Sequence, residues 1–172
     1  MKRRKQRPGR RDEVAGLVTA AARARLLAYA PYSRFRVGAA VRTREGKVYT
    51  GANVENASYP LSHCAERVAI HKAVSDGHRH LDTVVVVADG ETPAMPCGAC
   101  RQVMAEFGVR RVIAASPSRR TRVRTLRQLL ADPFLPERLL GTHGKAGSRE
   151  PPRRLRRLGA GRGNARRRRR LR

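Results

Sequence analysis

The chain has 172 residues, which is enough for one domain with a substantial core but not for two. It carries 39 Lys and Arg residues against 13 Asp and Glu residues, a formal net charge of +26. No stretch approaches the roughly 18 consecutive apolar residues of a membrane-spanning helix, and no apolar segment follows the basic N-terminus as in a secretory signal. We therefore expect no membrane partner.

The charge is unevenly distributed along the chain. Residues 1–11 hold seven basic residues and no acid, and residues 143–172 hold thirteen basic residues and one acid, whereas residues 12–142 hold nineteen basic and twelve acidic residues. Segments this charged and this poor in apolar residues cannot bury enough surface to fold. We expect a disordered basic tail over residues 1–11, a folded domain over 12–141 and a disordered Arg-rich tail over 142–172.

The Arg-rich tail has two interpretations. It could be an arm that contacts nucleic acid or another anionic surface. It could equally be a composition-driven extension, or even a misread gene end, because no regular spacing or interleaved aromatic residues mark a recognition module. Nucleic-acid contact by the tails is therefore possible but unsupported.

Hydrophobic patterning within the domain predicts alternating helices and strands. Acidic residues at 12 and 13 open a helix that ends before Pro31, and a β-hairpin follows around the Glu45-Gly46 turn. The further predicted elements are helices at 64–74, 96–108 and 125–130, and strands at 84–87 and 111–115. This order indicates an α/β fold in three layers, α/β/α, with a mixed central sheet of about five strands.

Three cysteines form the most informative pattern. Cys97 and Cys100 lie three residues apart at a predicted helix start, so one turn brings both sulfurs to one side, and Cys64 opens another helix. An odd, sparse set of cysteines argues against disulfides and for a reducing compartment, which we take to be the cytoplasm. Three thiolate ligands leave the fourth position of a tetrahedral Zn²⁺ open to water, as in catalytic zinc sites.

Glu66, two residues after Cys64, suits a general acid/base beside that water better than it suits a ligand. A lone Cys-x-x-Cys also occurs in redox pairs and structural zinc sites, and Glu66 alone could be a solvated helix residue. All elements together, in this order, match the zinc nucleobase deaminase pattern. His63 could replace Cys64 as ligand, but the residue two before the glutamate is Cys64, so we assign His63 either a structural role or a position next to the ligands.

Four longer motifs extend this pattern and resemble those of the small homotetrameric zinc-dependent cytidine deaminases of nucleoside salvage, from about residue 14 to about residue 140. The motifs are Ser33-Arg34-Phe35-Arg36-Val37-Gly38-Ala39-Ala40, Gly51-Ala52-Asn53-Val54-Glu55-Asn56-Ala57-Ser58-Tyr59, Cys64-Ala65-Glu66-Arg67 and Pro96-Cys97-Gly98-Ala99-Cys100-Arg101-Gln102. The resemblance implies a cytidine deaminase-like fold with one Zn²⁺ per subunit.

The resemblance also implies substrate contacts at matching positions. Asn53 and Glu55 match residues that hydrogen-bond the ribose hydroxyls, Phe35 matches an aromatic that packs on the pyrimidine, and the backbone of Ala65 matches a contact to the base. Without the resemblance, Asn53 could be a turn residue and Phe35 a core residue.

Three further residues carry implied roles. Tyr59 matches a tyrosine that reaches a neighbouring subunit's site, Phe134 an aromatic that stacks on a substrate held by another subunit, and Arg67 an arginine that donates to the cysteine sulfurs. The family's Pro and Gly around the Phe134 position are replaced here by Ala131 and Leu135. The Arg-rich tail is not part of the family pattern.

The implied reaction is hydrolysis of cytidine or 2′-deoxycytidine to the uridine counterpart and ammonia. Zinc would lower the pKa of a water molecule that attacks C4, and Glu66 would carry protons to N3 and then to the leaving amine. The alternative is a related zinc deaminase acting on a nucleoside-like antibiotic or on cytosine in RNA. A non-enzymatic alternative is a nucleic-acid-binding protein with a structural zinc, which would require a fourth protein ligand.

Overall fold

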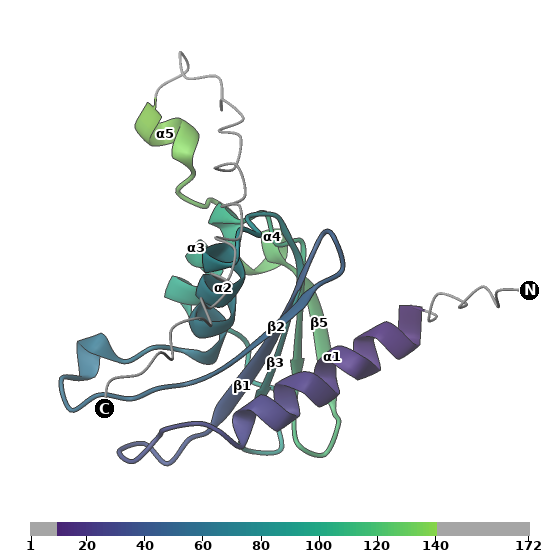
Figure 1. The fold of residues 1–172 in the computed structure, drawn as a ribbon, viewed down its shortest axis with the longest axis vertical. Helices are drawn as coiled ribbons and strands as arrows, with labels where there is room; N and C mark the ends of the chain where they lie inside the picture. The colour runs from purple at the N-terminus through teal and green to yellow at the C-terminus, as the bar shows by residue number, and fades with distance from the viewer. Residues whose placement is uncertain (1–9, 141–172) are drawn as a thin grey trace, which may run out of the picture.

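The computed structural model describes residues 10–140, and the predicted tails therefore lie almost entirely outside the described residues. Figure 1 shows a twisted sheet with helices packed against it. The elements in chain order are α1 (Arg10–Arg25), β1 (Val37–Thr43), β2 (Val48–Ala52), the 3₁₀ turn η1 (Tyr59–Leu61), α2 (Ala65–Ser75), β3 (Leu81–Ala88), α3 (Gly98–Glu106), β4 (Arg111–Ala115), β5 (Thr121–Thr125), α4 (Leu126–Leu129) and α5 (Pro136–Leu140).

The sheet is mixed and has five strands, as the sequence predicts. Its order is β2-β1-β3-β4-β5, with β3 and β4 parallel and the other three pairs antiparallel. The parallel pair is joined through α3, because parallel neighbours need a crossover connection rather than a tight turn. The hairpin of β1 and β2 forms one side of the sheet, and β5 forms the opposite edge.

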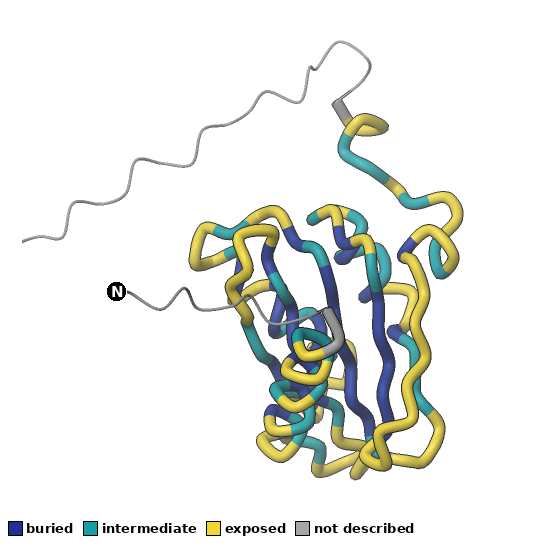
Figure 2. The backbone as a smooth tube through the Cα atoms, turned by 90° about the vertical axis from the view of Figure 1, so that its right-hand side faces the viewer, coloured by how far each residue is buried: buried dark blue, intermediate teal, exposed yellow. Residues whose placement is uncertain are grey.

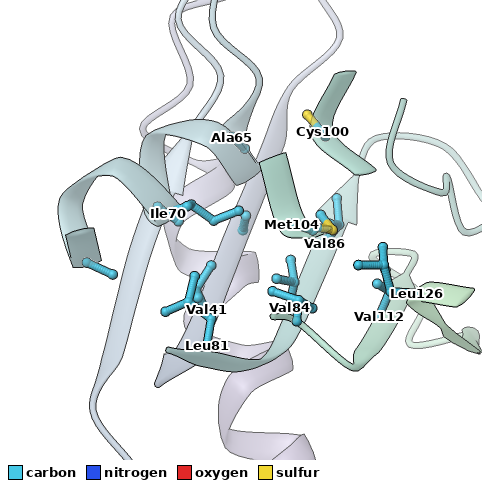
Figure 3. Close-up of a cluster of buried hydrophobic side chains, with 14 residues drawn as sticks. Val41, Ala65, Ile70, Leu81, Val84, Val86, Cys100, Met104, Val112 and Leu126 are labelled. Carbon is cyan, nitrogen blue, oxygen red and sulfur yellow. The ribbon is translucent and has the colours of Figure 1, made fainter. Parts of the chain in front are cut away.

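Helices cover both faces of the sheet and complete the three predicted layers. Val85 and Val87 of β3 pack toward α1, where Leu17 and Ala21 are buried. Alternate residues of the same strand, with Val84 among them, pack toward α2 and α3. Figure 3 shows this second core, which also holds Leu81, Val112 and Met104. The continuous apolar run in β3 is therefore buried on both faces, as predicted.

Two glycines let helices approach the sheet more closely than any side chain would allow. A Cβ at Gly38 would lie 2.1 Å from the Ala21 carbonyl oxygen in α1, and a Cβ at Gly51 would lie 2.5 Å from the Ala69 nitrogen in α2. Both obstacles are backbone atoms, which cannot rotate away. The close approach at Gly51 fixes the depth at which α2, and the residues at its N-terminus, lie against β2.

Several elements differ from the sequence-based expectation. The first helix ends before Pro31 as predicted, at Arg25, but it begins at Arg10 rather than at the acidic residues, and the sequence analysis did not identify η1, β5 or α5. Every residue of β5 is exposed, so this strand has no buried face that would produce an apolar alternation. Its pairing with β4 is what makes it a strand. None of the described helices is long and apolar enough to cross a membrane.

We expect Gly51→Ala to destabilise the fold, because α2 must move away from the sheet to admit the methyl group. Overpacking of this kind typically costs 1–3 kcal/mol, which corresponds to a thermal midpoint lower by roughly 5–10 °C. Gly16→Ala is the matched control, since a Cβ there meets nothing within 4 Å and alanine favours a helix. Equal melting temperatures for the two variants would contradict the close-approach argument.

Candidate active site

The three cysteines come together at the N-termini of two helices. Cys64 is the N-cap residue of α2, Cys97 is the N-cap residue of α3, and Cys100 lies in the first turn of α3. Neither N-cap side chain forms a capping hydrogen bond, so both sulfurs remain available for another partner. The three Sγ atoms all lie within 4.8 Å of one another, and the Cys64–Cys97 Sγ–Sγ distance is 4.0 Å.

This geometry fits zinc. A tetrahedral Zn²⁺ with Zn–S bonds of about 2.3 Å has S–S edges of about 3.8 Å, close to the observed separation of Cys64 and Cys97. All three cysteines are free thiols, and no other His, Cys, Asp or Glu among residues 10–140 joins the group. The donor set therefore suits a zinc ion with a fourth position left for water or substrate.

The ionisation of the three thiols also favours a bound cation. Hydrogen bonds from Cys100 and Cys97, together with the positive charge of Arg67, lower the pKa of Cys64 to about 5. The pKa of Cys100 is raised instead, because Cys100 donates to Cys64 and is itself buried. Cys64 therefore ionises more readily than Cys100, and a bound dication would favour the thiolate form of its sulfur ligands.

Arg67 lies next to this cluster on α2. Its Nη2 donates to the Ser62 carbonyl oxygen at 2.8 Å, and its Nε is buried without a hydrogen-bond partner in the described residues. The positive charge of Arg67 lowers the pKa of Cys64, and the donation from Arg67 to the cysteine sulfurs that the resemblance implies stays a prediction.

Glu66 is buried beside the cysteines in the first turn of α2, with 4% of its surface exposed. Burial raises its pKa to about 7, and the negative charge on Cys64 adds to the effect. A carboxyl group in this state exchanges a proton readily near neutral pH, as a general acid/base must.

A cavity of about 330 Å³ lies next to Glu66 and the cysteines. Cys64, Glu66 and Cys97 line one part of it, and the predicted substrate-binding residues Phe35, Asn53, Glu55, Tyr59 and Ala65 also line it. Its volume is that of a small-molecule site. The remaining lining residues are Ser33, Val37, Ser62, His63, Val86, Ala88, Ala94 and Met95.

Glu55 is buried in the cavity wall, with 7% exposure. Its Oε2 accepts hydrogen bonds from the backbone N–H groups of Tyr32 (2.9 Å) and Ser33 (3.2 Å), and its Oε1 accepts one from the Ser33 hydroxyl. These bonds, chiefly the one from Ser33, lower the pKa of Glu55 and keep it ionised. The sequence analysis gave Ser33 no role, although it opens a motif that was singled out.

Asn53 ties the hairpin to the segment that carries Phe35. Its Oδ1 accepts from the Val37 N–H at 2.8 Å, and its Nδ2 donates to the Phe35 carbonyl oxygen at 2.9 Å. The Asn53 side chain therefore holds the backbone of Phe35 and Val37 through two hydrogen bonds. It holds Phe35, which is 43% exposed, at the cavity.

Asp89 holds Arg36, the residue between Phe35 and Val37, through hydrogen bonds. Its Oδ2 accepts from the N–H of Arg36 (3.0 Å) and from the Arg36 Nε (3.2 Å), and its own N–H donates to the Arg36 carbonyl oxygen (3.0 Å). Arg25, at the end of α1, forms an ion pair with the other carboxylate oxygen. Asp89 thus connects α1, β3 and the cavity wall. The sequence analysis missed this residue, because nothing local in the sequence marks it.

Phe134 does not line the cavity of its own chain. It is 57% exposed, and its backbone exchanges two hydrogen bonds with the side chain of Gln102. Tyr59, on η1, is 59% exposed at the cavity's margin. Both side chains are thus available to contacts outside their own subunit.

Two further residues shape the surroundings of the cysteines. Arg101 donates from Nε to the Pro96 carbonyl oxygen at 2.8 Å and from Nη1 to the Leu129 carbonyl oxygen at 2.9 Å, which ties the segment before Cys97 to α4. His63 bonds the Leu61 carbonyl through Nδ1 at 2.8 Å and pairs with Val54 through the backbone. Among the described residues it does not belong to the sulfur cluster, although it lines the cavity.

Three thiols with an open coordination position, a buried carboxyl group and an adjoining cavity define a catalytic zinc site. The family described as the cytidine and deoxycytidylate deaminase zinc-binding region matches residues 12–116. The chain belongs to this family of enzymes, and zinc is its cofactor.

Individual relatives agree with this assignment. A cytidine deaminase of Halalkalibacterium halodurans is 58% identical over 91 residues, which are 53% of this chain and 69% of that protein. A probable cytidine deaminase of Dictyostelium discoideum is 43% identical over 130 residues, 75% of this chain and 88% of that protein. The crystal structure of a Burkholderia pseudomallei cytidine deaminase superposes with a TM-score of 0.67 at 46% identity, covering 70% of this chain and 98% of the other.

We expect Cys97→Ala to abolish stoichiometric zinc binding and to lower the thermal midpoint, because two thiols and water hold zinc far more weakly than three thiols. Metal content by mass spectrometry and a melting curve measure both effects. Ser75→Ala, at the distal end of α2, is the control and should retain one zinc per chain. Unchanged zinc content in the Cys97 variant would exclude that residue as a ligand.

Proposed function

We propose that this chain catalyses the hydrolytic deamination of cytidine and 2′-deoxycytidine to uridine and 2′-deoxyuridine, with release of ammonia, in pyrimidine salvage. The observation that carries the proposal is one cavity lined both by Cys64 and Cys97 with Glu66 and by Glu55 with Asn53. Such a cavity can hold a base at the metal and a sugar at the polar end. The named relatives are cytidine deaminases, which supports the same substrate class.

The proposed chemistry divides between metal and protein. Zinc, when bound by Cys64, Cys97 and Cys100, supplies a water of lowered pKa at the open coordination position. Glu66 accepts a proton there and delivers it to N3 of the pyrimidine, which makes C4 more electrophilic. The water oxygen bonds to C4, and Glu66 then passes the remaining proton of that oxygen to the amino nitrogen, so that the C4–N bond breaks and ammonia leaves. Its raised pKa suits both the acceptance and the return of the proton.

The rest of the cavity orients the nucleoside. We assign Phe35 to packing on the pyrimidine ring and the backbone of Ala65 to a contact with the base. Asn53 and Glu55 are assigned to the ribose hydroxyls. A carboxylate kept ionised at the sugar end favours free hydroxyl donors over the phosphates of a polymer, which argues against RNA as substrate.

We further propose a homotetramer with composite sites in the cytoplasm. Tyr59 and Phe134 are large and more than half exposed, and Phe134 does not line the cavity that holds Glu66, so a neighbouring subunit would use both. Three thiols that must stay reduced to bind zinc suit a reducing compartment.

Native mass spectrometry of the zinc-loaded protein tests the assembly. Four chains of 19.1 kDa should be detected as one complex with four times the mass of the chain. A monomer that retains full activity would exclude composite sites.

We expect Glu66→Gln to keep zinc bound and to lower kcat for cytidine by 10²–10⁴-fold, because the amide cannot transfer protons. The loss of cytidine absorbance reports turnover, and metal analysis reports zinc. Glu106→Gln, at the exposed end of α3, is the control and should retain activity. Wild-type turnover in the Glu66 variant would refute its acid/base role. Activity on single-stranded RNA or a nucleoside-like antibiotic, but none on cytidine, would refute the proposed substrate.

We expect Asp89→Asn to raise KM for cytidine by about five- to tenfold while kcat stays within twofold. Loss of the Arg25 ion pair loosens residues 35–37, and a weakened charge-assisted contact costs about 1 kcal/mol. Asp89→Glu should recover part of the affinity, and Glu91→Gln, an exposed carboxylate two residues away, should match wild type. A fall in kcat with an unchanged KM would contradict a positioning role.

A further inference from the structure

One region of the described chain carries charge of a single sign. Residues 10–140 contain twenty-one basic and twelve acidic residues, yet residues 107–131 contain seven arginines and no Asp or Glu. These arginines are Arg110, Arg111, Arg119, Arg120, Arg122, Arg124 and Arg127. None of them lines the cavity of the proposed active site. The region is therefore separate from the chemistry described above.

The arginines are arranged along the edge of the sheet. Strand β5 pairs with β4 and with no other described strand, and all five of its residues are exposed. Figure 2 shows it as an exposed border beside the buried strands. Arg122 and Arg124 oppose Ala114 and Val112 of β4, so both lie on the same side of the sheet. Arg120 directly precedes β5, two residues before Arg122, and its carbonyl oxygen accepts from the Ser116 N–H. We call Arg120, Arg122 and Arg124 the arginine edge.

The arginine edge is not used inside the protein. Arg110 forms an ion pair with Asp82 at 2.8 Å, and Arg111 donates to the Thr83 hydroxyl at 3.3 Å. By contrast, no residue of the arginine edge forms an ion pair with any residue between 10 and 140. Arg124 donates only to the neighbouring Val123 carbonyl. Three exposed guanidinium groups are therefore free to bind an anion.

We propose that the arginine edge binds single-stranded nucleic acid. Alternate residues of a strand lie about 6.6–6.8 Å apart. Arginines at alternate positions therefore form a row of guanidinium groups that can contact successive phosphates of a polyanion. Guanidinium groups bind phosphate oxygens in pairs and stack on bases. The free backbone groups of an edge strand add donors and acceptors for sugars and bases. The partner is a ligand of this surface and not a substrate of the zinc site.

An anionic membrane fits this surface less well. Peripheral membrane binding requires apolar side chains beside the basic ones. The large apolar side chain in β5 is Val123, which opposes Ile113 and therefore lies on the opposite side of the sheet from Arg122 and Arg124. A second explanation is that the charges protect an edge strand from pairing with other chains. That explanation predicts self-association, rather than loss of binding, when the charges are removed.

The test uses the full-length, zinc-loaded protein and a fluorescein-labelled 20-nucleotide uridine RNA. Fluorescence anisotropy between 50 and 200 mM KCl compares the triple variant R120Q/R122Q/R124Q with R23Q/R79Q/R138Q, which loses the same charge from exposed positions elsewhere. The single variant R122Q provides a milder change. Cytidine deamination, measured in parallel, checks that each variant is folded.

We expect the edge variant to bind RNA roughly ten- to a hundredfold more weakly at 50 mM salt. The slope of log Kobs against log salt should fall by about 2 for the triple variant and by about 0.7 for R122Q, with little change for the control. Ultraviolet cross-linking should place RNA on peptides from residues 117–128.

Four results would overturn the proposal. Equal losses in both triple variants would mean that net charge alone attracts RNA. Cross-links confined to residues 1–11 and 143–172 would assign the binding to those segments. Binding to vesicles of phosphatidylserine and phosphatidylcholine that RNA does not compete would indicate a membrane surface. Aggregation of the edge variants with unchanged RNA affinity would indicate protection of the strand edge.

Discussion

The charge balance at two helix N-termini is the constraint on which the rest of this structure depends. Three thiols converge there, where the pKa of Cys64 is lowered and that of Cys100 is raised, and a bound dication would offset the repulsion between neighbouring thiolates. Arg67 and the helix dipoles reduce the repulsion without removing it. The negative charge on Cys64 acts with burial on Glu66 and keeps that carboxyl group near its midpoint at neutral pH. The proposed metal binding and the proposed proton transfer therefore depend on one electrostatic arrangement.

That arrangement depends in turn on how closely the helices pack against the sheet. Three of the five buried residues of α2 are alanines, Ala65, Ala69 and Ala73, and the helix meets β2 at Gly51. Small residues on both surfaces bring the α2 backbone, and with it Cys64 and Glu66, close to the sheet. Larger side chains would lift the helix and move Cys64 relative to the sulfurs on α3. Packing of small residues thus fixes the metal geometry.

The sequence was most informative about residues that lie close together both along the chain and in the folded structure. Cys97 and Cys100 are separated by one helical turn, and Cys64 and Glu66 share the start of α2, so their proximity could be predicted locally. The alternation in β1 and the apolar run in β3 likewise gave the sheet its central strands. By contrast, β5 has no buried face, and only its register with β4 defines it.

Contacts between distant segments could not be predicted in this way. Asp89 bonds Arg36 and Arg25 across 53 and 64 residues. Nothing in the sequence near any of the three indicates those bonds. The resemblance gave Asn53 and Glu55 a role toward ribose, but it did not show that both side chains also hold the protein's own backbone. Such double use is visible only when both partners are placed in space.

This double use bears on how the proposed sugar site would work. An ionised carboxylate can accept about four hydrogen bonds, and Glu55 accepts three from Tyr32 and Ser33. One acceptor position on Oε1 therefore remains, and the three existing bonds fix its direction. Asn53 likewise keeps one donor and one acceptor position after bonding Phe35 and Val37. A ribose would meet polar groups that are already oriented, so little ordering cost would accompany binding, and the residues that hold the cavity wall would also select the sugar.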